Sequence, residues 1–222
     1  MDLEPGELHN ETAGPGWAKP AYQQRSRQQR DRLLKAGERV FAETGFSQAH
    51  VADIAGRAGC SVGSFYRRFQ DKEAFFFSLQ TDMTAHAETN IARFFDDPAC
   101  LTDPLGEVFA RLVRNTARTM IGIKGYYRAL FELSMQGHDV WPPMRRIVLM
   151  EAGRISQLLR QRGAPDDAGL DGRAYLAIRL LHGQIVSAML HGPGPYTADD
   201  PRLHAELTEM MVRFLGLEAK PA

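Results

Sequence analysis

A serine between two glycines is the first group in this sequence whose type and spacing could carry out chemistry. The segment GCSVG, residues 59–63, has the G-x-S-x-G spacing of a hydrolase nucleophile. That nucleophile needs a buried β-strand leading into the serine, but the preceding residues, VADIAGRA, are rich in alanine and have the apolar spacing of a helix. Histidines follow at 182, 191 and 204, so the sequence contains residues in the order serine, acid, histidine, but nothing else indicates a catalytic triad. A hydrolase that uses Ser61 is therefore a remote alternative.

The same segment fits a helix-turn-helix, in which a short turn leads into a helix that enters the major groove of DNA. Gly59 can adopt the positive φ that favours a helix C-terminus, and the Ser61 hydroxyl can cap the helix that follows. Residues 62–69 would span roughly 12 Å at 1.5 Å per residue, which is comparable with the width of the groove. We therefore expect a recognition helix here.

Apolar spacing divides this expected helix into two faces. The positions expected to face the core are Val62, Phe65 and Phe69. The positions expected to face outward are Gly63, Ser64, Arg67 and Arg68. An outward arginine can bind guanine or hold a phosphate, and the sequence leaves both roles open for Arg67.

Three short amphipathic helices are expected between about residues 25 and 69, joined by the short loops 45–50 and 59–61. Positive charge is concentrated in the same region. Residues 19–72 carry eleven Lys or Arg against five Asp or Glu, a net charge of +6, although the formal net charge of the whole chain is zero. Such a block is either a solvated helix face or a phosphate-binding surface.

Four motifs follow one another in this region: F-x-x-x-G-F at Phe41 to Phe46, D-I-A-x-x-A-G-x-S-x-G at Asp53 to Gly63, F-Y-x-x-F at Phe65 to Phe69, and D-K-E at Asp71 to Glu73. With them, the sequence over about residues 25–80 closely resembles the N-terminal DNA-binding domain of the TetR family of bacterial transcriptional regulators. The resemblance implies a homodimer that binds double-stranded operator DNA.

The resemblance also implies which residues meet DNA. The expected set is Ser47, His50, Ser61, Gly63, Ser64, Phe65, Tyr66, Arg67 and Lys72. Tyr66 and Lys72 match family positions that donate to phosphate, although Tyr66 is also suited to a half-buried core position. Many relatives have a threonine before the second helix where this chain has Ala49 and His50, so that phosphate contact is lost or moves to Ser47 or His50.

The rest of the chain predicts an all-α protein with a larger helical domain. A helix of about 25 residues after Asp71 would span close to 40 Å, enough to link a DNA-binding head to a separate core. Further helices are expected at about 104–121, 124–135, 142–162, 173–190 and 202–216. The expected organisation is a disordered extension over 1–24, acidic and then basic, a DNA-binding domain over 25–72, and an effector-binding and dimerisation domain over 73–222.

The middle helices carry many aromatic and methionine side chains, which suit either plain core or an adaptable apolar pocket. As a group they resemble the effector pocket of TetR-type regulators. The expected effector-binding residues are Phe109, Thr116, Met120, Tyr127, Phe131, Trp141 and His182. The expected effector is a small, largely apolar or aromatic molecule.

The last two helices have apolar or small residues around most of their circumference, so they must be covered on several sides. Pairing with a second copy would cover them, and the alternative is a pair of internal core helices. The expected dimer interface comprises Ile178, Leu181, Ile185, Met189, Leu207, Met211 and Phe214.

Several classes of protein and site are not expected. His182 and His191 lie nine positions apart and make poor co-ligands on one helix, so no metal site and no cofactor are predicted. No apolar run approaches the roughly 20 residues that a membrane-spanning helix needs, and we expect a cytoplasmic protein with reduced thiols at Cys60 and Cys100. The function expected is a dimeric repressor released by its effector, and the alternative is an activator or a regulator without a small-molecule switch.

Overall fold

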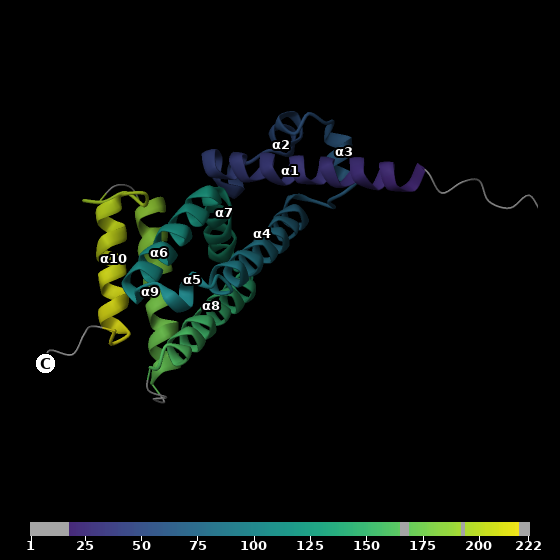
Figure 1. The fold of residues 1–222 in the computed structure, drawn as a ribbon. Coiled ribbons are helices and arrows are strands. Elements are labelled where there is room, and N and C mark those ends of the chain that lie inside the picture. The colour runs from purple at the N-terminus through teal and green to yellow at the C-terminus, as the bar shows by residue number, and fades with distance from the viewer. Residues whose placement is uncertain (1–17, 165–168, 192–193, 218–222) are drawn as a thin grey trace, which may run out of the picture.

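The computed structural model describes residues 18–164, 169–191 and 194–217, and all regular secondary structure in these ranges is helical (Figure 1). The all-α prediction, with a helix-turn-helix head and a helical C-terminal domain, is confirmed. Residues 1–17 of the expected extension lie outside the described residues, while helix α1 begins at Ala18, within that extension. No helix in the described ranges combines the length and apolar character needed to cross a bilayer.

The head consists of three helices. They are α1 (Ala18–Gln48), α2 (Val51–Arg57) and α3 (Val62–Tyr66). Helix α3 is shorter than the expected 62–69, but its hydrogen bonding continues in a turn, because Phe69 N donates to Phe65 O at 3.0 Å. The α1 assignment runs across a kink at Gly45, whose φ of 81° and ψ of 175° are not helical. The expected loop from residue 45 is therefore present as this kink.

Phenylalanine rings fill the interior of the head. Phe41 and Phe65 are fully buried there, as is Phe75, which the first turn of the following helix contributes to the interior of the head, and the rings of Phe65 and Phe69 lie 5.2 Å apart. The inward positions predicted for Phe65 and Phe69 are confirmed. The inward position predicted for Val62 is wrong, because Val62 lies in the first turn of α3 and its side chain is 40% exposed.

The outward position expected for Ser64 is also wrong, because Ser64 faces the interior. Its side chain is buried, and its hydroxyl lies 3.0 Å from the Ser61 hydroxyl and accepts from Arg67 Nη2 at 2.7 Å. A small hydroxyl with two local partners can be buried without an unsatisfied polar group. The helix is thus rotated so that Ser64, rather than Val62, faces inward with Phe65.

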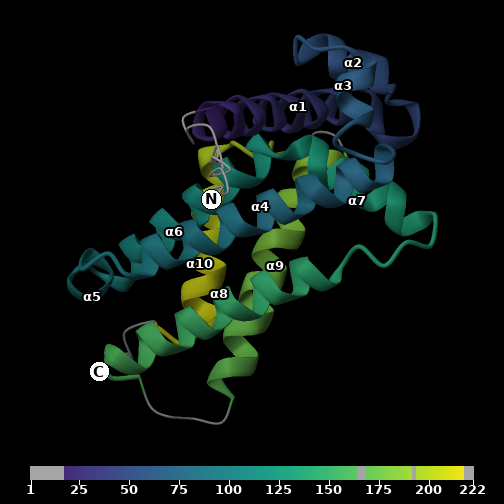
Figure 2. The same cartoon turned by 90° about the vertical axis from the view of Figure 1, so that its right-hand side faces the viewer.

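The body begins with a long helix that leaves the head and runs diagonally down the molecule (Figure 1). The body helices are α4 (Lys72–Phe95), α5 (Ala99–Thr102), α6 (Leu105–Gly122), α7 (Lys124–Met135), α8 (Pro142–Gln161), α9 (Leu170–Leu190) and α10 (Pro201–Phe214). The short α5 lies where a loop was expected. Helix α4 packs on α8, α8 on α9, and α6 on α10 (Figure 2).

The head rests on α7 through a close contact with α1. A Cβ on Gly125 would lie only 1.9 Å from the Glu38 carbonyl oxygen, so the two backbones touch where Gly125 has no side chain. Gly125 N donates to Glu38 Oε1 at 2.8 Å, and Arg128 Nη1 donates to the carbonyl oxygens of Ala42 and Glu43 at 3.1 and 3.0 Å. The head is therefore joined to the body both by α4 and by the packing of α1 on α7.

Candidate DNA-binding surface and effector cavity

The turn between α2 and α3 is formed by residues 59–61 of the GCSVG segment. Gly59 has a φ of 68°, a conformation in which a side chain is strained. Ser61 is the N-cap of α3, and its Oγ accepts from Ser64 N at 3.2 Å. Helix α2, not a strand, precedes this turn, so the geometry required for a nucleophile elbow is missing at Ser61.

The exposed surface of α3 offers hydrogen-bond donors and a flat backbone. Tyr66 is 53% exposed and Arg67 is also exposed, with only one of its donors engaged by Ser64. A Cβ on Gly63 would meet no atom nearer than 3.9 Å, so the backbone there is open to close approach. Phe65 was expected at the DNA, but its side chain is fully buried and belongs to the core.

Arg68 ties the end of α3 to the N-terminal half of α1, a contact that the sequence did not reveal. Its guanidinium donates to Ser26 Oγ and to Gln29 Oε1, both at 2.9 Å. These contacts join residues about 40 positions apart, so no short-range pattern in the sequence indicates them. The neighbouring Arg25 and Arg27 are exposed on α1, so this contact places further positive charge beside α3.

Lys72 is used differently from the expected phosphate donor. Its Nζ donates to the carbonyl oxygens of Phe46 at 2.6 Å and Ala49 at 3.0 Å, and it lies 4.6 Å from the centre of the Phe46 ring. Burial lowers the pKa of this ammonium group. In this structure Lys72 closes the C-terminal end of α1.

Ser47 and His50 are both exposed beside α2. The Ser47 hydroxyl accepts from Gln136 Nε2 at 3.1 Å, and Ser47 N donates to Glu132 Oε2 at 2.8 Å. His50 is the N-cap of α2 but makes no side-chain capping bond there. Of the two, Ser47 is held by the body helix α7.

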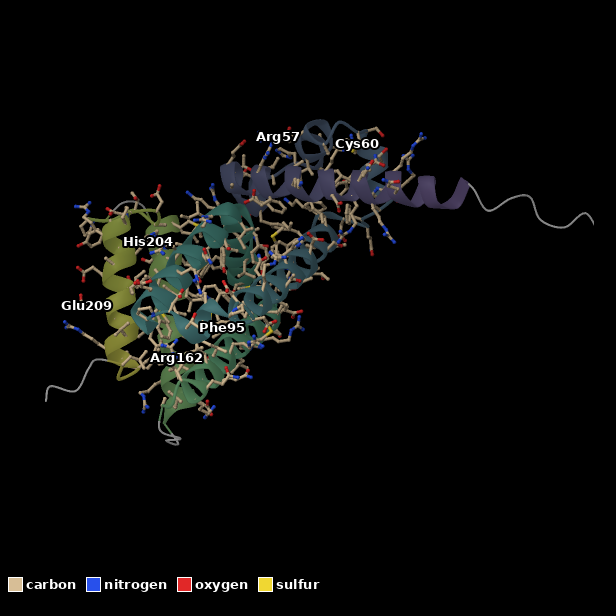
Figure 3. All side chains as sticks on the ribbon, viewed as in Figure 1. Arg57, Cys60, Phe95, Arg162, His204 and Glu209 are labelled. Atoms are coloured by element: carbon tan, nitrogen blue, oxygen red, sulfur yellow. The ribbon has the colours of Figure 1, made fainter. Side chains whose placement is uncertain are left out.

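The body contains a cavity of about 460 Å³ between α4, α6, α7 and α8, with one side chain from α9. Its apolar wall comprises Met83, Ala87, Ile91, Phe94, Phe95, Leu112, Met120, Ile123, Met144 and Ile147. Figure 3 labels Phe95 in the body, far from Arg57 and Cys60 in the head. A largely apolar cavity of this size is suited to a small organic molecule.

Four of the seven expected effector-binding residues line the cavity: Thr116, Met120, Tyr127 and His182. The other three lie elsewhere. Phe109 is buried in the surrounding core, and the rings of Phe131 and Trp141 pack 5.2 Å apart, with Trp141 Nε1 donating to Ser134 Oγ at 2.7 Å. Those aromatic side chains pack against protein rather than against the cavity.

A polar group at the cavity wall was not anticipated. Glu151 on α8 is only 3% exposed, and its Oε2 lies 3.1 Å from His182 Nε2. Burial first, and then the neighbouring Tyr126 and Glu151, raise the pKa of the Tyr127 phenol. Burial also raises the pKa of Tyr126 to about 12, and its hydroxyl accepts from Gln80 Nε2 at 3.1 Å. A single glutamate within a helix gives no sequence signal that distinguishes this position from a solvated one.

The expected dimer residues face the interior of the protomer. Ile178, Leu181, Ile185, Met189, Leu207 and Met211 are buried, and Phe214 is half-buried. The alternative of internal core helices therefore describes these side chains. The outer surface of α9 instead exposes Tyr175, Leu176 and Leu180.

Comparisons with known proteins agree with this geometry. Residues 33–79 match the model for bacterial regulatory proteins of the tetR family. The chain is 49% identical over 53 residues to the uncharacterized HTH-type transcriptional regulator YdgC of Bacillus subtilis (strain 168), over 24% of this chain and 27% of the relative. It is 34% identical over 68 residues to the HTH-type transcriptional repressor DhaR of Mycobacterium sp. (strain GP1), over 31% and 34%.

These sequence matches span about a quarter to a third of the relatives' length. The fold of both parts resembles the crystal structure of a TetR-family transcriptional regulator from Mesorhizobium loti, with a TM-score of 0.63 at 19% identity, over 85% of this chain and 97% of that one. The head is thus similar to the DNA-binding part of tetR-family regulatory proteins, and the whole chain has the fold of a solved TetR-family regulator.

Proposed function

We propose that the protein is a DNA-binding transcriptional regulator, a dimeric repressor that binds a palindromic operator and is released by a small, largely apolar or aromatic effector. Residues 25–72 form the DNA-binding domain and residues 73–222 the effector-binding and dimerisation domain. The observation that carries the proposal is that α4 and α7, which both hold the head, also form walls of the cavity.

DNA binding is supported by the chemistry of the exposed face of α3. The Tyr66 hydroxyl and the unengaged donors of Arg67 suit phosphate oxygens, and a guanidinium can also bind guanine. The capped turn at Ser61 and the open backbone at Gly63 allow the start of α3 to approach the duplex. The recognition helices of a dimer would have to lie about 34 Å apart, or a multiple of it, to occupy successive half-sites.

Dimerisation is supported by the outer face of α9. Leu176, Leu180 and Gly183 are exposed and fall at i, i+4 and i+7, so they share one side of the helix. Exposed leucines beside a glycine allow two helices to pack closely, and a second copy of α9 would cover them. This face replaces the buried set that the sequence suggested.

Effector control is supported by the position of the cavity between the two connections to the head. A molecule that changes the separation of α4 and α7 would change the angle of the head and hence the spacing of the recognition helices. A 1,000-fold loss of operator affinity corresponds to about 4 kcal/mol of coupling between the two sites. The chain's head resembles that of DhaR, which is named a repressor, and this favours repression over activation.

The proposal is tested by binding of the DNA upstream of the protein's own gene across a salt series. Several phosphate contacts predict a steep negative slope, and a flat slope would contradict the proposal. Arg67→Ala is expected to weaken binding about tenfold, or about 1.4 kcal/mol, while Arg145→Ala on the exposed side of α8 serves as the charge-matched control. Release of the same DNA by a cavity ligand separates a switch from simple DNA binding. An activator would raise transcription from that promoter.

A further inference from the structure

The cavity has two chemically different parts. Its outer part carries exposed polar and basic side chains from α4 and α6: Asn90, Arg93, Asn115, Arg118 and Thr119. Its inner part is apolar except for the Tyr126 and Tyr127 phenols, the Thr84 and Thr116 hydroxyls and the pair of Glu151 and His182. An effector that reaches the inner part must therefore be compatible, in charge and in hydrogen bonding, with the almost completely buried carboxylate of Glu151.

Glu151 has capacity for one more hydrogen bond. Its Oε2 lies 3.1 Å from His182 Nε2. No hydrogen bond joins its Oε1 to the residues that the structure describes, and Oε1 is not among their fully buried atoms that lack a partner, so it is accessible from the cavity that Glu151 lines. A buried carboxylate without enough donors costs free energy, and a donor supplied by a bound molecule recovers part of it. The phenols of Tyr126 and Tyr127 are protonated at neutral pH, and burial raises the pKa of both, so neither adds negative charge beside Glu151.

The surrounding charges restrict the ligand further. Arg93, Arg111 and Arg118 line the cavity against a single outer acid, Asp97, so an organic cation would have to pass a basic opening. A ligand carboxylate placed at the inner end would meet Glu151 and be repelled. A pure hydrocarbon would displace water and leave Oε1 without a donor. A neutral hydroxyl avoids all three costs.

We propose that the effector is a neutral, mainly apolar molecule bearing an alcohol or phenol hydroxyl, which donates its proton to Glu151 Oε1 while its body lies against the methionine and aromatic walls. This inference rests on the effector response proposed above and names the ligand class of that site. Specificity comes from the donor, because a site built to hydrogen-bond a hydroxyl discriminates strongly against an analogue that lacks it.

The test uses five probes with one hexylbenzene body and different head groups: 4-hexylphenol, 4-hexylanisole, hexylbenzene, 4-hexylbenzoate and 4-hexylbenzylammonium. Calorimetry on the full chain without DNA gives their dissociation constants. We expect 4-hexylphenol to bind about tenfold more tightly than 4-hexylanisole, because the methyl ether accepts but cannot donate. Tightest binding by the benzoate or the ammonium, equal binding of phenol and anisole, or no binding by any of the five would each overturn the inference.

The Glu151→Gln variant tests the acceptor. It keeps the size of the side chain but removes the charge that strengthens the hydrogen bond, so the preference for phenol over anisole should fall about threefold or more. Glu206→Gln, on the exposed side of α10, is the matched control and should keep the wild-type preference. A full preference in Glu151→Gln would overturn the inference. The wild-type probe series remains decisive if that variant fails to fold.

The two proposals fail separately. Probe binding is measured without DNA, so loss of the hydroxyl preference contradicts only the ligand class. Failure to bind upstream DNA contradicts the regulator, whatever the cavity binds.

Discussion

The head and the body of this protein differ in what fills their interiors. In the head, Phe65, Phe69 and Phe75 are in mutual contact, with ring centroids 4.9 to 5.2 Å apart. In the body, flexible methionines and a buried glutamate surround a cavity of about 460 Å³. A close-packed interior holds one shape, whereas a lined cavity leaves room for a guest. The difference assigns rigidity to the part that we propose meets DNA and adaptability to the part that we propose binds an effector.

The largest effect is expected from emptying the aromatic core of the head. Phe75 is fully buried and contacts Phe41, Phe65 and Phe69, so Phe75→Ala should lower the free energy of unfolding by about 3–5 kcal/mol. Phe77→Ala is the control, because Phe77 is two residues away on α4 and 38% exposed. Chemical denaturation measures both. Equal losses in the two variants would show that the interior of the head is not tightly packed.

A second effect, about 1–3 kcal/mol, is expected where the rigid head meets the body. In Gly125→Ala the added Cβ would stand 1.9 Å from the Glu38 carbonyl oxygen and 2.6 Å from Ala42 N, and both neighbours are backbone that cannot rotate away. Gly122→Ala is the control, since its Cβ would meet nothing within 4 Å and alanine favours a helix. A neutral Gly125→Ala would show that α1 and α7 are not in firm contact.

The same difference explains what could be predicted from the sequence. In the head, fixed motifs identified the three helices and placed Phe65 and Phe69 in the core. Periodicity alone could not give the rotation of a five-residue helix, so Val62 and Ser64 were exchanged between its faces. Phe65 was assigned to DNA because a motif position does not state which way its side chain points.

In the body, spacing predicted where helices occur but not what covers them. An apolar face such as Ile178, Leu181 and Ile185 has the same pattern whether it packs inside the protomer or against a second copy. Cavity walls are also apolar, so Trp141 and Met120 looked alike although only Met120 lines the cavity. Glu151 was missed because its burial results from α8 packing on α4 and α9, which no local pattern encodes.

The smallest effect is expected from truncating a side chain that already borders empty space. Met120 is buried but lines the cavity, so Met120→Ala removes fewer packing contacts than usual and should cost about 1 kcal/mol, below the usual 2–5 kcal/mol for a buried methionine. Leu130→Ala is the matched control on α7, because Leu130 is fully buried and is not among the lining residues, and it should cost the usual amount. The two variants should also differ in how they bind ligands. Enlarging the cavity at Met120 should improve binding of a bulkier probe such as 4-octylphenol relative to 4-hexylphenol, whereas Leu130→Ala should leave that ratio unchanged. Equal costs for the two variants would mean that the cavity closes around Met120 in solution, and the body would then be as tightly packed as the head.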